Sequence, residues 1–159
     1  MKMDSLLERE YRLDDLMPLI QEALEAGKTV RFKPRGVSML PMIRQGIDSV
    51  VLSPISGKLR KYDLPLYRRD DGKYILHRII EAGNTYTCIG DNQFDYEPGV
   101  RQDQLIAVVT AFTRDKTEHK VTEAGYRLYC RLWHWLRPVR HFWRRGKGWL
   151  KRHFKKPSP

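Results

Sequence analysis

Between residues 28 and 113 the chain consists of short strand-like runs separated by turn-forming residues. The candidate strands are residues 29–33, 48–53, 63–68, 73–81, 84–89 and 104–112. Asp70-Asp71-Gly72 and Ala82-Gly83-Asn84 have the composition of hairpin turns. Short strands joined in this way pair with their neighbours, so we predict a partly closed antiparallel β-domain. Pro65 lacks a backbone N–H, so its strand is expected to lie at an edge or to carry a bulge.

Helical patterns flank this β-domain on both sides. Residues 5–26 have apolar side chains at helical spacing, with Pro18 expected to split the helix and Gly27 to end it. From Gly125 onward, aromatic and aliphatic residues recur every three or four positions among Arg and Lys, which predicts a basic amphipathic helix interrupted near Pro138. The expected organisation is a helical segment (1–27), a mainly β domain (28–113), a connector (114–124) and an amphipathic tail (125–159).

The positive charge of the chain lies in this tail. The formal net charge is +11, and residues 126–159 hold 11 Lys and Arg, all four Trp and no Asp or Glu. A neutral body with such a tail favours contact with an anionic membrane surface. Binding of single-stranded nucleic acid, or packing of residues 126–135 on the β-domain, are the alternatives. The candidate anion-binding residues are Arg137, Arg140, Trp143, Arg144, Arg145, Trp149, Lys151 and Arg152.

Other features bear on cofactors and compartment. Cys88 and Cys130 stand far apart, without a second Cys or a ligand-spaced His nearby, so we expect no disulfide framework, metal or cofactor. The first residues are too charged for a signal peptide or an anchor, and no run of 18 apolar residues occurs. We therefore expect a cytoplasmic protein, held peripherally at the inner face of the membrane.

Three segments carry side chains suited to nucleophilic or acid–base chemistry. In residues 36–41 (Gly-Val-Ser-Met-Leu-Pro), the Gly and Pro favour a turn that presents Ser38 together with backbone N–H groups. Strand alternation places His77 on an apolar face, where it is either a core histidine or a general base. Gly90-Asp91-Asn92 has an ordinary turn composition. Each segment alone has a structural explanation as good as a functional one.

Taken together and in this order, the three segments resemble the serine peptidases of the type I signal peptidase and LexA-like superfamily. The likeness covers residues 29–113. Ser38 stands in the nucleophile box Ser-Met-x-Pro, His77 on the strand of the general base, and Gly90-Asp91-Asn92 in the Gly-Asp-Asn box. Asp63 stands where the family has a Gly-Asp pair, with Tyr62 replacing the glycine. A His rather than a Lys base resembles the endoplasmic-reticulum and archaeal branch, and the whole chain resembles its small anchorless bacterial members.

This resemblance implies acyl transfer to a serine. Ser38 would attack a peptide carbonyl while His77 accepts its proton, and the backbone N–H groups of Val37 and Ser38 would bind the oxyanion. A His needs little pKa adjustment but does need an acceptor for its second nitrogen. Asp91 is the candidate for that acceptor, with Asp95 or Glu97 as substitutes. The expected substrate is a peptide or a precursor protein.

Two departures from the family keep an alternative open. The chain lacks the family's N-terminal membrane anchor, and its leading helix is too short for the helix-turn-helix of the repressors. The alternative is a non-catalytic binding module on the same fold, tethered to a membrane surface or to nucleic acid by the tail. A Ser38 hydroxyl and a His77 ring that cannot approach one another would favour it.

Overall fold

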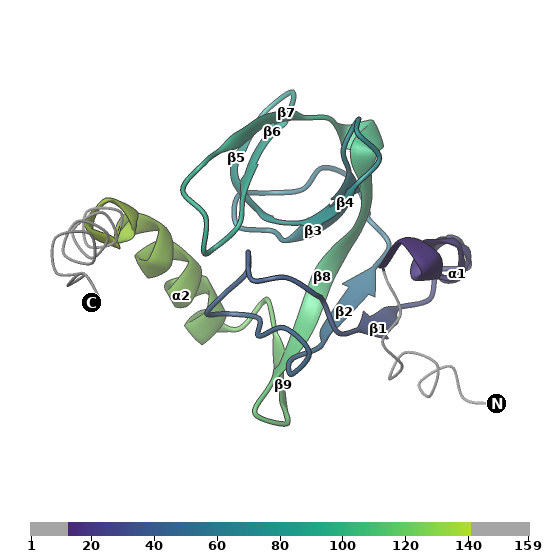
Figure 1. The fold of residues 1–159 in the computed structure, drawn as a ribbon, viewed down its shortest axis with the longest axis horizontal. Coiled ribbons are helices and arrows are strands. Elements are labelled where there is room, and N and C mark those ends of the chain that lie inside the picture. The colour runs from purple at the N-terminus through teal and green to yellow at the C-terminus, as the bar shows by residue number, and fades with distance from the viewer. Residues whose placement is uncertain (1–12, 141–159) are drawn as a thin grey trace, which may run out of the picture.

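Two antiparallel β-sheets, with a helix at each end of the chain, make up the fold (Figure 1). The computed structural model describes residues 13–140. The helices are α1 (Leu13–Glu25) and α2 (Ala124–Trp135), with a 3-10 turn η2 (Gln102–Gln104) before β8. The strands are β1 (Val30–Phe32), β2 (Val50–Ser53), β3 (Pro65–Arg68), β4 (Tyr74–Leu76), β5 (Arg78–Ala82), β6 (Tyr86–Ile89), β7 (Glu97–Val100), β8 (Leu105–Arg114) and β9 (Thr117–Lys120).

Helix α1 covers one end of the larger sheet, beside β1 and β2 (Figure 1). It buries Met17, Ile20 and Leu24, which lie on one face because they are spaced three and four residues apart. Pro18 was expected to split this helix, and that expectation is wrong, because α1 runs through Pro18 without interruption. Apolar residues before and after Pro18 are buried, and this burial stabilises the helical turn in which the proline has no N–H to donate.

The larger sheet has the strand order β1-β2-β8-β3-β4, and β9 also pairs with β8. The long strand β8 runs through its middle (Figure 1). Val50, Leu52, Leu66 and Val109 point into the main core beneath α1. Pro65 begins β3, an interior strand rather than an edge, and the pairing of β3 with β8 shifts by one residue just after it. A proline at the first position of a strand costs no ladder hydrogen bond.

The smaller sheet, β5-β6-β7, packs over a second core around Tyr67 and Ile79. The expected continuous strand over residues 73–81 is wrong, because the chain leaves the larger sheet after Leu76 and enters the smaller one at Arg78. His77 is the single residue between the two. Among the described strands the pairings form no closed ring.

Two strands lie where the sequence indicated none. Strand β7 contains Pro98 and Gly99, which are turn formers, and it pairs with β6 through a shifted register. Strand β9 lies inside the expected connector 114–124 and forms a hairpin with β8. Its tight turn places Asp115 and Lys116 at φ 48° and 68°. Among residues 13–140, no helix has the length and apolar character that crossing a bilayer requires.

Candidate active site

The nucleophile-like turn lies directly against the Gly-Asp-Asn turn. A side chain at Gly90 would have its Cβ 2.7 Å from Ser38 O and 3.0 Å from Ser38 Cβ, which is closer than real Cβ contacts allow. Asn92 donates its backbone N–H to Ser38 O at 2.8 Å and its side-chain amide to Val37 O at 3.1 Å. Position 90 must therefore be glycine, and two segments more than 50 residues apart form one site.

The third segment joins this site through the register of β5 and β6. Arg78 pairs with Ile89 and Ile79 with Cys88. His77 directly precedes Arg78 and Gly90 directly follows Ile89, so both residues adjoin this end of the strand pair. Gly90 also lies against Ser38, so the strand pair that begins after His77 ends beside the serine turn. The structure thus brings together the three segments that the sequence singled out.

His77 is buried, with its Nδ1 directed at an acid and a phenol. Nδ1 lies 3.5 Å from Tyr67 Oη and 3.7 Å from Glu97 Oε2. Burial lowers the pKa of His77 to about 4, although the Glu97 carboxylate opposes this. The ring is therefore neutral near pH 7 and able to accept a proton. With Nδ1 facing Glu97, Nε2 is the nitrogen left for a reacting group.

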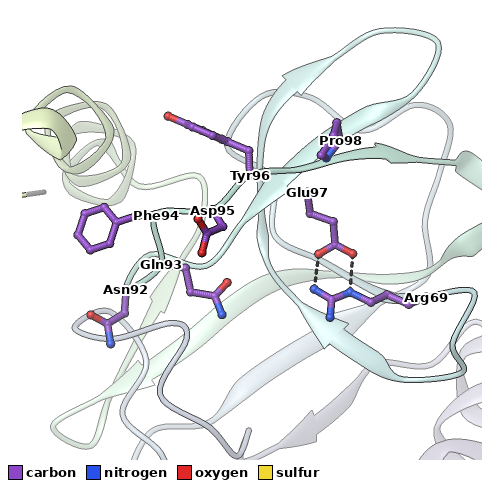
Figure 2. Close-up of a pocket in the computed structure, with 8 residues that line it drawn as sticks. All are labelled: Arg69, Asn92, Gln93, Phe94, Asp95, Tyr96, Glu97 and Pro98. Atoms are coloured by element: carbon purple, nitrogen blue, oxygen red, sulfur yellow. Dashed lines mark hydrogen bonds and ion pairs between the residues drawn. The ribbon is translucent and has the colours of Figure 1, made fainter.

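Glu97 is held by two residues of β3 and its hairpin. Tyr67 donates its hydroxyl to Glu97 Oε2 at 2.6 Å, and Arg69 binds both carboxylate oxygens at 2.5 Å (Figure 2). Burial alone would raise the pKa of Glu97, but the hydrogen bonds from Arg69 and Tyr67 lower it overall. Glu97 is therefore ionised, and its negative charge faces the imidazole.

Asp91 was the sequence candidate for orienting His77, and the structure gives it a different partner. Its carboxylate forms a two-pronged ion pair with Arg78, with Nε to Oδ1 at 2.8 Å and Nη2 to Oδ2 at 2.7 Å. Both side chains are only 3 % exposed. Arg78 and His77 point in different directions because they are consecutive residues, so Asp91 binds the former. Glu97, one of the two substitutes, lies at His77 instead.

The turn that carries Ser38 leaves backbone donors available. Gly36 adopts a φ of 98°, which strongly favours glycine, and its N–H donates to the Gln45 side chain. Among the described residues, no group of the protein accepts a hydrogen bond from the N–H of Val37 or Ser38. Ser38 is half-buried and Val37 is exposed. The two expected oxyanion donors are thus accessible.

Among the described residues, Ser38 Oγ and the His77 ring form no direct hydrogen bond. Such bonds are often long in the absence of substrate and shorten when a substrate is bound. The residues concerned are the Ser38 hydroxyl, a neutral imidazole at His77 and an ionised carboxylate at Glu97.

Two pockets flank the segment that follows the Gly-Asp-Asn turn. One, of about 610 Å³, is lined by Arg69 and by residues 92–98, and Figure 2 shows Glu97 and Arg69 bonded to each other in its lining. The other, of about 340 Å³, is lined by Leu40, Pro41, Asn92, Phe94, Trp133 and Arg140. Asn92, which binds the Ser38 turn, belongs to both pockets.

Helix α2 is bound to the same turn. Trp133 Nε1 and Arg140 Nη2 each donate to Asp91 O at 2.9 Å, and Arg137 donates to Gln93 O. The first part of the tail therefore packs on the β-domain, as one of the three alternatives proposed. Arg137 and Arg140, expected to bind anions, each donate to a backbone carbonyl of this turn, and their anion binding stays a prediction. The remaining candidates, Trp143, Arg144, Arg145, Trp149, Lys151 and Arg152, lie outside the described residues.

Tyr62 lies in a turn with an unusual backbone conformation. Its φ of 77° is in the left-handed region that favours glycine. Its backbone N–H donates to Ile79 O and the following Asp63 O accepts from Ile79 N, so this turn pairs with β5 beside His77. Tyr62 thus adopts a backbone conformation typical of glycine although its side chain is large.

Comparison with known proteins adds no relative. No family model, curated protein or solved structure matches the chain. Within residues 13–140, no group of three or more His, Cys, Asp or Glu is placed to hold a metal ion. Cys88 and Cys130 are buried free thiols. Arguments about function therefore depend on the residues themselves.

Proposed function

We propose that this protein is a serine endopeptidase in which Ser38 is the nucleophile and His77 the general base. One observation carries the proposal: Gly90 lies against Ser38, and Ile89, the residue before Gly90, pairs with Arg78, the residue after His77. The ionised Glu97 at His77 Nδ1 supplies the third member that such a site needs. The proposed fold kinship is with the signal peptidase and LexA-like peptidases, and the meeting of their three sequence boxes supports it.

In this mechanism each group has one task. Ser38 Oγ attacks the peptide carbonyl carbon while His77 Nε2 takes the hydroxyl proton. Glu97 accepts from Nδ1–H and stabilises the imidazolium that forms. The N–H groups of Val37 and Ser38 bind the oxyanion, and His77 then protonates the departing amine. Water, activated by the same histidine, hydrolyses the acyl-serine and releases the enzyme.

The buried state of His77 gives this mechanism a particular pH profile. A base with a pKa of about 4 is unprotonated across the neutral range. We therefore expect kcat/KM to stay level between about pH 6 and 8 and to fall only in more acid solution. An ordinary exposed histidine would instead lose half of its activity near its reference pKa of about 6.5.

The test compares the intact chain with Ser38→Ala on a defined pool of synthetic decapeptides, with cleavage read by mass spectrometry. We expect the wild-type chain to cut some peptides and Ser38→Ala to cut them at least about 1,000-fold more slowly. Ser53→Ala is the matched control, because Ser53 is a half-buried serine that bonds Thr110 in the larger sheet. Equal cleavage by the wild type and Ser38→Ala, or no cleavage by the wild type, would contradict the proposal.

A further inference from the structure

Helix α2 has two contrasting faces. One face packs on the body: Tyr126 and Cys130 are buried against Arg78, and Trp133 binds the carbonyl of Asp91. The backbone bonds from Leu136 N to Leu132 O and from Arg140 N to Leu136 O continue the helical turns beyond Trp135. Helix α2 itself ends at Trp135, with Leu136 as its C-cap, and these turns extend its surface to Arg140.

The opposite face is apolar and uncovered within the described part of the chain. Five residues form this stripe: at about 100° per residue, Leu128, Leu132, Trp135 and Val139 lie away from the packed face, and Leu136 lies at the edge nearer to it. Their exposed fractions are 56 % for Leu128, 47 % for Leu132, 75 % for Trp135, 38 % for Leu136 and 58 % for Val139. Five of the nine large apolar residues exposed between residues 13 and 140 belong to this stripe. A cluster of this kind marks an interaction surface.

The charge around the stripe indicates what covers it. Arg127 and Arg131 are exposed on the same helix, on the flank of the stripe. Residues 126–159 hold 11 Lys and Arg and no acid. A second copy of the chain would bring an equally positive segment against this one, which is repulsive. Nucleic acid would use the arginines but not the aliphatic side chains. An anionic lipid surface satisfies both the charge and the apolar stripe.

We infer that the exposed stripe of α2 inserts into the interface of an anionic membrane, with Arg127 and Arg131 at the headgroups. The opposite face of the same helix holds residues 91–93 of the candidate site. Bound in this way, the site lies about one helix diameter, ~10 Å, from the lipid surface. This inference stands on the exposed stripe and the charge, independently of whether Ser38 is catalytic.

The experiment is flotation of the full chain with vesicles of phosphatidylcholine alone or mixed with phosphatidylglycerol at 3:1. We expect flotation with the anionic vesicles only. Leu128→Glu and Trp135→Glu should each lower the partition coefficient at least about ten-fold, because each removes one inserted side chain and adds a negative charge. Leu19→Glu on α1 is the matched control, because Leu19 is also 56 % exposed and the substitution is the same. It should float as the wild type does.

Each other outcome overturns the inference. Equal flotation with neutral and anionic vesicles would show that binding does not require anionic lipid. No flotation with either would show that the stripe does not bind a membrane. Flotation that Leu128→Glu and Trp135→Glu leave unchanged assigns binding to charge outside the stripe. A dimer in sedimentation analysis that Trp135→Glu dissociates assigns the stripe to a second copy. Binding of a single-stranded oligonucleotide that Trp135→Glu abolishes assigns it to nucleic acid.

Discussion

The buried ion pair between Arg78 and Asp91 connects every part of the candidate site. Arg78 follows His77, Asp91 follows Gly90, and helix α2 closes over both. Besides the two bonds to Asp91, the guanidinium donates to Tyr126 Oη at 2.8 Å and contacts Cys130 Sγ at 2.9 Å. Burial lowers the pKa of Arg78, but the Asp91 carboxylate more than offsets this, so the pKa lies above its ordinary value. The arginine is therefore always charged, and it depends on Asp91 for its counter-charge.

Asp91→Asn should expose that dependence. The amide keeps the size of the carboxylate but leaves a buried guanidinium without a negative partner. Removing one member of a buried pair costs about 3–5 kcal/mol. A domain of this size has a free energy of unfolding of about 5–15 kcal/mol. With a urea m-value of about 2 kcal/mol/M, the unfolding midpoint should fall by about 1.5–2.5 M.

The assay is urea unfolding followed by circular dichroism at pH 7. Asp71→Asn is the control, because Asp71 pairs with Lys73 at 2.9 Å while their side chains are 47 % and 71 % exposed. Its midpoint should barely change, since water screens that pair. Arg78→Met combined with Asp91→Asn should be less unstable than the two single changes together, because the double variant has no buried charge.

Two results would refute this reasoning. A midpoint shift below about 0.5 M for Asp91→Asn would mean that water reaches the guanidinium. Strict additivity in the double variant would mean that the two residues act independently. Either result would show that the ion pair of Arg78 and Asp91 does not connect strand β5, which follows His77, to the Gly-Asp-Asn turn.

Three further predictions follow from other parts of the structure. Burial lowers the pKa of His77 to about 4, so between pH 6.5 and about 4 the unfolded chain binds a proton that the folded chain does not, and the free energy of unfolding falls as the pH falls. His77→Gln should remove roughly 3 kcal/mol of this decrease, measured by urea unfolding at several pH values. The same pH dependence in the variant and the wild type would contradict this. Lys116 has a φ of 68° in an exposed turn, a conformation that is strained for residues other than glycine. Lys116→Gly should therefore raise the free energy of unfolding by about 0.5–1 kcal/mol, and a decrease would contradict this explanation. Glu97→Gln should lower kcat at least about 100-fold while leaving KM within about two-fold, and equal kcat would exclude Glu97 as the orienting acid.

The candidate nucleophile and base could be identified from sequence motifs, but the acid beside the histidine could not. Ser38 and His77 stand in short motifs, and turn chemistry or strand position makes each one visible. Glu97 stands beside Pro98 and Gly99, which hide the strand it belongs to. No local pattern distinguishes it from Asp91 or Asp95. Only the pairing of β6 with β7 and the side chains of Tyr67 and Arg69 place it at the imidazole.

The same division applies to the tail. Its spacing predicts an amphipathic helix, and α2 confirms that helix over Ala124–Trp135. Its composition cannot say which face packs inward, because Trp133 and Trp135 are equally apolar. Contact with the Gly-Asp-Asn turn decides this: Trp133 is half-buried there and Trp135 is 75 % exposed.

What the amino-acid sequence determined by itself was therefore local: the positions of most strands and turns, the two helices, the charge of the tail, and the residues with reactive side chains. Propensity, periodicity and charge act over a few neighbouring residues, so a single chain reveals them. What the tertiary structure decided was which strands and side chains pair with one another. The break at His77 between two sheets, the choice of Glu97 over Asp91, and the capture of Arg78 by Asp91 depend on segments that meet only after folding. Burial then strengthens those pairings, because away from water each charge must find its partner within the protein.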